Sequence, residues 1–317
     1  IGLYSSTYNT IRDNTIIDAG LEGMYLGYTS VSNNICCNKI NGNNNGSGIY
    51  ISGNSDVNYI ENNTIENLET FGIKVLNCNG GGIGFFKNNT IRNSSQYGIY
   101  MMDCTGYLIE GNNIVNCSYE SIYINGSSTS ASGFIIKNNE ISQGCDDGIY
   151  LYNATNCQIS GNYIHNMSTG SNYMIYTLAS HITISENVLE NSPGRYGIYI
   201  NGVSPHDITI SSNIIKNVTT GMYIGGHHTI GVDFPAYQIT VYSNKISDLF
   251  SNTTLKSYGI YVYLSHNITV RKNNITNANY GVYMKNVWSS SVSQNDFWKI
   301  FGLSSSSIYL YLSLIHI

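Results

Sequence analysis

The chain has 317 residues, a formal net charge of −5 and only 10% charged residues. Phosphate binding needs a basic face, so this charge argues against nucleic acid as a partner. No apolar run approaches the roughly 18 residues of a membrane span. The polarity comes mainly from uncharged side chains, which favours a secreted or cell-surface protein. Because the sequence begins inside a repeat, we expect it to be a fragment without its signal segment.

An asparagine motif recurs along the whole chain. Each copy has Ile, Val or Phe three residues before the asparagine and Ile, Leu or Phe two residues after it. The copies are 22 to 31 residues apart, and this period predicts a solenoid whose turns pack only on their neighbours. The buried amides should bond their equivalents in adjacent turns, as an asparagine ladder. The twelve positions are Asn14, Asn38, Asn63, Asn89, Asn112, Asn139, Asn162, Asn187, Asn213, Asn244, Asn273 and Asn295.

A Gly-aliphatic-Tyr triplet follows most of these asparagines by about eleven residues, as in Gly98-Ile99-Tyr100. Its alternation predicts a half-buried strand, and two columns in step imply at least two strands per turn. Glycine before a strand is typical of a turn that needs a positive φ. We therefore expect positive φ at column glycines such as Gly98 and Gly197.

Two solenoid folds contain an apolar-x-x-Asn-x-apolar segment. Residues 182–189 also fit a leucine-rich repeat, whose return path is a helix or a similarly compact segment. Here the return path has strand alternation and Gly, Asn and Ser clusters that oppose helix. The sequence therefore predicts an all-β fold, a single-stranded right-handed parallel β-helix of about 12 turns over residues 1–309. Right-handedness is expected because parallel crossovers almost always have that hand.

The two columns resemble the repeats of right-handed parallel β-helix proteins with the pectin-lyase-like fold. That group includes polysaccharide lyases, glycoside hydrolases, NosD-type copper-maturation proteins and surface adhesin-like proteins. The resemblance covers nearly the whole chain and implies the fold. It implies little about activity, because the repeated residues are structural.

The tyrosines of the triplets form a column of candidate ligand-binding residues. If they face outward, they can hold a glycan chain by stacking and hydroxyl hydrogen bonds. The alternative is a cross-strand aromatic ladder that only stabilises the sheet. The candidates are Tyr100, Tyr123, Tyr150, Tyr176, Tyr199 and Tyr223.

Charged residues align just before several triplets. Aligning the turns places Glu120, Asp146 and Asp147 within one turn of each other, and Arg195 about two turns, roughly 10 Å, further along. Clustered carboxylates raise each other's pKa or bind a hard cation, here Ca²⁺. Acids beside an arginine would suit a polysaccharide lyase or glycoside hydrolase. The alternative is ordinary acids at surface turns.

Comparison with enzyme motifs argues against catalysis. Polygalacturonase-like hydrolases carry an Asp pair with Gly-His-Gly and Arg-Ile-Lys elements. This chain is similar in Asp146-Asp147, but it has Gly226-His227-His228 and no Arg-Ile-Lys. The Arg-rich signatures of pectate lyases are also missing.

The stretch from Tyr223 to Asn244 is about eight residues longer than a usual repeat, which predicts a surface loop. This loop contains His227, His228 and Asp233, which are ligand types for a transition metal. Such a site would suit the NosD-like resemblance. The alternative is a solvated loop, because two adjacent histidines rarely reach one ion.

The last six residues, 312–317, resemble the translation of a sequencing adapter. We therefore expect residues 310–317 to be a non-native tail, the alternative being a terminal strand. The sequence as a whole favours a non-catalytic, adhesin-like scaffold with a carbohydrate ligand. A polysaccharide lyase or glycoside hydrolase comes second, and a copper-handling protein third.

Overall fold

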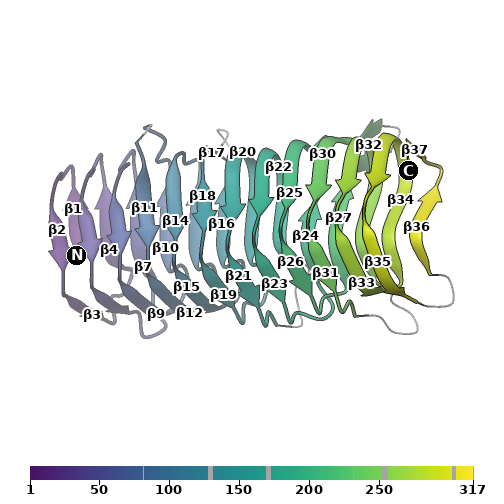
Figure 1. Cartoon of the computed structure of the whole chain (residues 1–317). Helices are drawn as coiled ribbons and strands as arrows, with labels where there is room; N and C mark the ends of the chain where they lie inside the picture. Colours follow the sequence, from purple (N-terminus) through teal and green to yellow (C-terminus); the bar gives the residue numbers. More distant parts are fainter. Residues whose placement is uncertain are drawn as a thin grey trace. The chain divides into compact units, whose positions relative to one another are not determined.

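The computed structural model describes residues 1–80, 82–127, 131–168, 173–230, 232–250, 256–301 and 305–316. These residues form strands, turns and loops, and none of them is helical. Accordingly, the described part of the chain contains no helix that could span a membrane. The contacts divide the chain into two compact units, unit 1 (Ile1–Tyr163) and unit 2 (Ile164–Ile317). Each unit is a coil of short strands (Figure 1).

A full turn has three strand segments. The Tyr strand carries the Gly-aliphatic-Tyr triplet, the pre-ladder strand ends just before the repeated asparagine, and the post-ladder strand follows that asparagine. Within each unit, equivalent strands of successive turns pair in parallel, as Tyr100 pairs with Tyr123. Strands on the return path in place of a helix exclude the leucine-rich repeat and confirm the parallel β-helix.

The strands of unit 1 fall into these three sets. Its Tyr strands are β1 (Gly2–Tyr4), β4 (Glu22–Gly27), β7 (Ser47–Ser52), β10 (Ile73–Leu76), β13 (Ile99–Met102) and β16 (Ile122–Asn125). Its pre-ladder strands are β2 (Thr10–Arg12), β5 (Asn34–Cys36), β8 (Tyr59–Glu61), β11 (Gly84–Lys87), β14 (Tyr107–Glu110) and β18 (Ile135–Lys137). Its post-ladder strands are β3 (Thr15–Ile17), β6 (Lys39–Asn41), β9 (Thr64–Leu68), β12 (Thr90–Ser94), β15 (Asn113–Cys117) and β19 (Glu140–Ser142). Strand β20 (Ile149–Ser160) runs through both a Tyr and a pre-ladder segment, and β17 (Ala131–Ser132) pairs with it.

Unit 2 repeats the arrangement with longer continuous strands. The strands that combine a Tyr and a pre-ladder segment are β22 (Tyr173–Ser185), β32 (Tyr258–Arg271) and β34 (Tyr280–Ser293). Separate Tyr strands are β24 (Tyr196–Ile200), β27 (Thr220–Gly225) and β36 (Ser306–Tyr311), and separate pre-ladder strands are β25 (His206–Ser211), β30 (Ala236–Tyr242) and β37 (Leu314–His316). The post-ladder strands are β23 (Val188–Glu190), β26 (Ile214–Lys216), β31 (Lys245–Ser247), β33 (Asn274–Ala278) and β35 (Asp296–Ile300), while β21 (Tyr163–His165) spans the boundary of the units.

The asparagines form the predicted ladder within each unit. In unit 1, Asn89 Nδ2 donates to Asn112 Oδ1 at 3.0 Å, and Asn112 Nδ2 donates to Asn139 Oδ1 at 2.9 Å. The same Asn112 oxygen also accepts the backbone N–H of Asn89 at 3.0 Å. In unit 2, Asn213 Nδ2 donates to Asn244 Oδ1 at 2.9 Å. These amides are almost fully buried, so the ladder satisfies polar groups that would otherwise be costly inside the coil.

A left-handed backbone conformation precedes every ladder asparagine. The residue before it has a positive φ in all twelve copies, for example 58° at Asp13 and 55° at Lys272. This single residue bends the chain between two strands and turns the amide inward. The bend is the reason that the asparagine keeps a fixed place between two inward apolar residues.

The prediction of positive φ at Gly98 and Gly197 is wrong. Neither glycine has a positive φ, and the space around them explains the column instead. A Cβ on Gly98 would lie 2.5 Å from the carbonyl oxygen of Ser121, and one on Gly197 would lie 2.6 Å from that of Gly221. Glycine suits this column because the backbones of adjacent turns approach closely at this corner, although Ser121 and Met174 also stand in it.

The interior of each turn is apolar. In one turn of unit 1, Ile99, Met101, Ile109 and Ile114 are fully buried. Burial of each such side chain contributes roughly 1.5–3 kcal/mol. Outward residues such as Tyr100 alternate with these inward ones, so the coil presents one residue in two of each Tyr strand to the outside.

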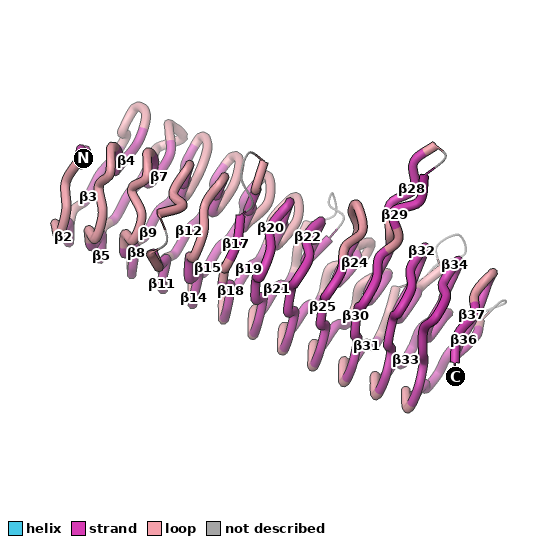
Figure 2. The backbone as a smooth tube through the Cα atoms, turned by 90° about the horizontal axis from the view of Figure 1, so that it is seen from above, coloured by secondary structure: helices cyan, strands magenta, loops and turns pink. Residues whose placement is uncertain are grey.

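Two segments of unit 2 depart from the regular coil. The insertion after β27 forms an antiparallel hairpin of β28 (His227–Thr229) and β29 (Val232–Phe234), which projects from the coil (Figure 2). At the end of the chain, β36 and β37 pair with β34 in parallel. The assignment of residues 310–317 to a non-native tail stays a prediction, as does the domain boundary at 309, and residue 317 lies outside the described residues.

Candidate functional site

The tyrosine column faces outward in both units. In β13, Ile99 and Met101 are buried, and Tyr100 between them is half-buried. The rings follow one another in register along the sheet of each unit. The registered neighbours are Tyr100, Tyr123 and Tyr150 in unit 1, and Tyr176, Tyr199 and Tyr223 in unit 2.

The tyrosine rings pack on one another. Tyr100 and Tyr123 stack with centroids 5.3 Å apart and planes at 19°, and Tyr123 meets Tyr150 edge-on at 5.1 Å. In unit 2, Tyr199 and Tyr223 stack at 4.5 Å with planes at 9°. The ring faces of such stacked pairs are therefore shared with neighbours. A ligand would meet mainly ring edges and hydroxyl groups, and it would find fewer open faces than the sequence suggested.

A second outward column lies at the corner just before the column glycines, and we call it the corner column. In unit 1 it holds aromatic rings at Phe71 and Tyr97, which stack 5.6 Å apart with planes at 7°. The next two turns carry Glu120 and Asp147 instead. Their backbone carbonyls accept from Gly98 N at 3.3 Å and Ser121 N at 3.0 Å, one turn apart. The structure thus places Glu120 and Asp147 at the same position of adjacent turns.

Glu120 and the rings of Tyr97, Tyr100 and Tyr123 belong to two adjacent turns, and we call these three rings the tyrosine frame. Glu120 is only 9% exposed. The three rings pack on one another with centroids 5.0 to 5.3 Å apart, and burial raises the pKa of each ring, with a smaller contribution from the charge of Glu120. Burial raises the pKa of Glu120 itself to about 7, with a smaller contribution from the charge of Asp146. A carboxyl group with this pKa exchanges a proton at neutral pH.

The two aspartates complete an acidic group on unit 1. Asp147 is 5% exposed and Asp146 is half-buried. The charge of Asp146 contributes to the raised pKa of Glu120. The backbone register places Glu120 and Asp147 on adjacent turns, while a joint catalytic or Ca²⁺-binding role of the three acids stays a prediction.

Another acid of the corner column has a similar setting. Glu22 of β4 lines a surface pocket together with Tyr4, Tyr25 and Tyr28. Tyr25 packs on Tyr4 at 5.4 Å between ring centroids. An acid on the same turns as packed tyrosine rings thus occurs twice in the corner column of unit 1, and sequence analysis did not identify this one.

Arg195 belongs to unit 2 and is 1% exposed. Its guanidinium donates to the carbonyl oxygen of Ser168, through Nε at 3.1 Å and also through Nη2. Its own carbonyl accepts the backbone N–H of Thr219 at 2.8 Å. These contacts fix a loop within unit 2. A catalytic role of Arg195 beside the three acids stays a prediction.

The projecting hairpin holds His227, His228 and Asp233, all of which are exposed. His228 Nδ1 and Asp233 Oδ1 form an ion pair, as expected for directly opposed residues. His227 is opposite Phe234, and neighbouring residues of a strand point to opposite faces. The hairpin therefore provides a pair of ligands, and His227 points away from it.

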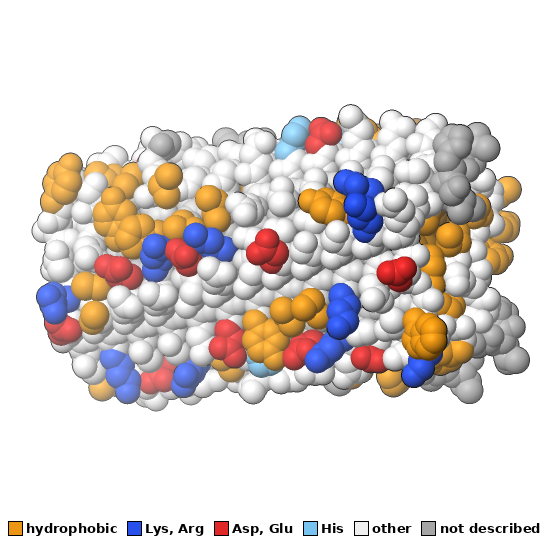
Figure 3. Space-filling model, in the orientation of Figure 1, with side chains coloured by type: hydrophobic (Ala, Val, Ile, Leu, Met, Phe, Trp, Pro, Cys, Tyr) orange, Lys and Arg blue, Asp and Glu red, His pale blue; other side chains and the backbone are white. Residues whose placement is uncertain are grey.

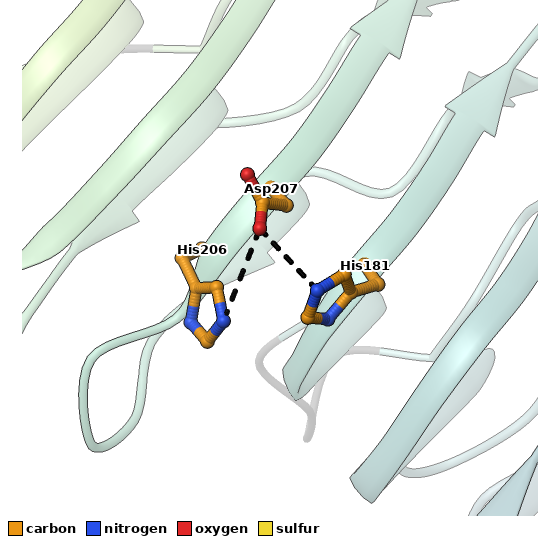
Figure 4. Close-up of side chains that lie close together, drawn as sticks. All are labelled: His181, His206 and Asp207. Atoms are coloured by element: carbon orange, nitrogen blue, oxygen red, sulfur yellow. Dashed lines mark ion pairs between the residues drawn. The ribbon is translucent and has the colours of Figure 1, made fainter.

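Sequence analysis missed a group of three ligand-type side chains in unit 2. Nitrogen and oxygen atoms of His181, His206 and Asp207 lie within 4.8 Å of one another (Figure 4). Among the residues that the structure describes, no other group of three or more His, Cys, Asp or Glu side chains meets in this way. The signal was present, because alignment on Ile182 and Ile208 places His181 directly beside Asp207.

Charge is sparse on the visible surface. On the face in Figure 3, acidic and basic side chains lie scattered among uncharged polar groups. Among the charged residues of unit 1, ion pairs join adjacent turns, such as Lys87–Glu110 at 3.1 Å and Lys137–Glu110 at 3.2 Å.

Comparisons with known proteins agree on the fold. A family model described as a right-handed beta helix region matches residues 74–246. A search of curated protein sequences gives no significant match. Among solved structures, the A-module of an Azotobacter vinelandii mannuronan C-5 epimerase is 13% identical, with a TM-score of 0.61 over 98% of this chain and 89% of that one.

Two further solved structures are similar at the same level. A Streptococcus pneumoniae surface protein and adhesin, PfbA, is 14% identical, with a TM-score of 0.58 over 99% of this chain and 91% of that one. The DFA-IIIase of Arthrobacter chlorophenolicus, in complex with GF2, is 10% identical, with a TM-score of 0.57 over 92% and 75%. Identities this low are informative about the fold alone.

Proposed function

This chain belongs to the right-handed β-helix family, and we propose that it is a secreted or cell-surface scaffold that binds polysaccharide on the outer side of its Tyr strands. The observation that carries the proposal is the Glu120 site of unit 1. There the nearly buried Glu120 takes the corner position on the turn after Tyr97, and the rings of Tyr97, Tyr100 and Tyr123 on the same two turns pack on one another. The similar structures include a surface adhesin and a mannuronan C-5 epimerase, which supports a surface role or a carbohydrate partner.

The chemistry of this face favours a neutral sugar. Tyrosine hydroxyls both donate and accept hydrogen bonds, and they match the hydroxyl groups of a sugar ring. A uronate would meet the like charges of Asp146 and Asp147, which disfavours acidic polymers. In addition, Glu120 holds its proton at higher pH than an ordinary carboxyl, which opposes Ca²⁺ binding at this acidic group.

A binding experiment tests the proposal. The chain is screened against a panel of neutral and acidic polysaccharides, and hits are measured by titration calorimetry. We expect Tyr123→Ala to weaken binding about tenfold, because it removes the central ring of the frame. Tyr8→Ala is the matched control, since Tyr8 is 83% exposed and lies outside the tyrosine column. No binding to any polymer, or equal loss in the two variants, would contradict the proposal.

The raised pKa of Glu120 supports one second candidate, a glycoside hydrolase. A carboxyl group with a pKa of about 7 can donate a proton to a glycosidic oxygen at neutral pH, and Asp147 on the adjacent turn would be the second carboxylate. This enzyme would release reducing sugars from a bound polymer. The release should be abolished in Glu120→Gln and in Asp147→Asn, whereas a pure binding protein releases none.

A further inference from the structure

A second group of side chains lies at a left-handed bend of unit 2, where two adjacent turns of the coil meet. His181 in β22 and Asp207 in β25 occupy equivalent positions, with φ of 58° and 52°. His206 directly precedes Asp207 and so joins the group from the same turn as the carboxylate. The three residues therefore bridge two turns of the coil on its outer side (Figure 4).

Three electron-pair donors converge at this place. Asp207 Oδ2 lies 3.3 Å from His181 Nε2 and 4.0 Å from His206 Nε2. Ligand atoms about 2.1 Å from one tetrahedral ion lie about 3.4 Å apart. The His181–Asp207 distance matches this value, and the His206–Asp207 distance is about 0.6 Å longer than it.

Hydrogen bonds fix the tautomer of His206. Its Nδ1 lies 2.9 Å from the carbonyl oxygen of Ser204, which accepts hydrogen bonds only, and 3.1 Å from Ser180 Oγ. The ring proton of the neutral imidazole is therefore on Nδ1, and Nε2 carries the lone pair. An Nδ1–H bonded to a backbone carbonyl is the usual outer partner of a metal-binding histidine.

Ring stacking also holds His206 in place. Its ring stacks on Tyr237 with centroids 4.7 Å apart and planes at 3°, and it meets the His181 ring at 5.0 Å. A ring fixed on one face by an aromatic neighbour and at Nδ1 by hydrogen bonds loses little freedom on binding an ion. The lone pair of Nε2 then faces a carboxylate and a second imidazole, an arrangement that favours a cation between them.

We propose that His181, His206 and Asp207 form a binding site for a divalent transition-metal ion of the Zn²⁺ class. Two imidazoles and one carboxylate suit such an ion, whereas Ca²⁺ and Mg²⁺ prefer oxygen ligands. His181 and Asp207 are exposed and His206 is half-buried, so coordination positions remain open to water or to an external ligand. The site lies in unit 2 and does not rest on the proposed polysaccharide binding.

Metal titration tests the site directly. The chain is titrated with Zn²⁺ by calorimetry and with Co²⁺ by visible absorption, with excess Ca²⁺ present as a competitor. We expect one Zn²⁺ per chain, unaffected by Ca²⁺, and a Co²⁺ spectrum of nitrogen and oxygen ligation. His181→Ala, His206→Ala and Asp207→Asn should each weaken Zn²⁺ binding by at least about tenfold, and Ser180→Ala by about tenfold through the orientation of His206.

His266→Ala is the matched control. His266 lies in the same column as His206 and is also half-buried, and it stacks on Tyr237 at 5.3 Å. Its removal should leave Zn²⁺ affinity unchanged. Circular dichroism and thermal unfolding without metal confirm that the variants fold. Absence of Zn²⁺ binding would overturn the proposal. A loss of Zn²⁺ affinity in His266→Ala as large as that in His206→Ala would also overturn it.

Discussion

The corner columns of the two units occupy the same register but differ in chemistry. In unit 2 the column is mostly tyrosine, at Tyr173, Tyr196, Tyr258 and Tyr280, with Thr220 and Ser306 as the exceptions. In unit 1 it begins with Glu22 and Ser47, passes through Phe71 and Tyr97, and reaches Glu120 and Asp147. The exposure of this column varies from half-buried rings such as Tyr97 to Asp147 at 5% and Thr220 at 3%.

This difference distinguishes residues that the fold requires from residues that are free to provide a functional group. The ladder asparagines are identical in both units, since every turn leaves the same buried backbone groups to satisfy. The corner column has no such repeated requirement, and Glu120 and Asp147 stand where most other turns carry aromatic or hydroxyl side chains. A departure from the repeat on the outer side is therefore the best indicator of a site in this fold.

We expect the largest loss of stability from substitutions in the asparagine ladder, which is the same in both units. Asn112→Ala in unit 1 and Asn213→Ala in unit 2 each remove an oxygen that accepts two N–H groups, from Asn89 and from Asn187 respectively. Orphaned buried donors cost about 1–3 kcal/mol each, so we expect a loss of about 2–5 kcal/mol in the free energy of unfolding. Urea unfolding followed by circular dichroism measures it.

The half-exposed Asn14 provides the control for the ladder. Asn14→Ala should cost less than about 1 kcal/mol, because its amide and the backbone around it reach water. Equal losses for Asn14→Ala and Asn112→Ala would contradict the claim that burial makes the ladder essential.

Replacing a column glycine by alanine should lower the stability by a similar amount in the two units. Gly98→Ala and Gly221→Ala each place a Cβ 2.5 Å from a carbonyl oxygen of the next turn. Overpacking of this kind costs typically about 1–3 kcal/mol, measurable as a lower urea midpoint. Ser121→Ala, in the same column, should change stability by less than about 0.5 kcal/mol, because the Ser121 hydroxyl is buried without a hydrogen-bond partner in the described chain. A neutral effect at both glycines would contradict the close approach of the turns.

The corner column of unit 1 should make the free energy of unfolding depend on pH, because it contains Glu120. Burial raises the pKa of Glu120 from 4.5 to about 7, so the folded state binds more protons than the unfolded state between these values. Stability is therefore full below about pH 4.5 and falls as the pH rises toward 7. At 1.36 kcal/mol per pKa unit, and after a discount for solvent screening, the loss is about 1–2 kcal/mol.

Glu120→Gln should remove this pH dependence and be about 1–2 kcal/mol more stable than the parent chain at pH 8. Tyr196→Phe, the equivalent change in unit 2, should show no such slope, because burial raises the pKa of Tyr196 above its ordinary value of 10. Urea midpoints at pH 4, 6 and 8 measure both. A parallel pH dependence in Glu120→Gln and the parent would contradict the buried, proton-binding carboxyl.

Sequence periodicity was sufficient to predict the fold. It gave the β-helix, the ladder and the register that brings Glu120 and Asp147 to adjacent turns. These follow from period and alternation, which are local properties of the chain. The third strand of each turn and the reason for Gly98 were not predictable in this way, because close approach of backbones depends on the packed coil.

The site was only partly predictable for a similar reason. Alignment predicts which residues share a column, but not how far a side chain is buried or what surrounds it. The burial that raises the pKa of Glu120 depends on the packed coil, and Arg195 donates to the carbonyl oxygen of Ser168 through a contact outside the repeated columns. His181 and Asp207 were not predicted, because they lie outside the repeated asparagine and Gly-aliphatic-Tyr columns and meet only through the register of adjacent turns.

Direct titration of Glu120 tests the central claim that a departure from the repeat creates a chemically distinct carboxyl group. The carboxyl carbons of the chain are followed by NMR from pH 3 to pH 9, and Glu120 is assigned by comparison with Glu120→Gln. We predict a pKa of about 7 for Glu120. A pKa near the ordinary glutamate value of about 4.3 would mean that water reaches the carboxyl freely and that the tyrosine frame does not enclose it.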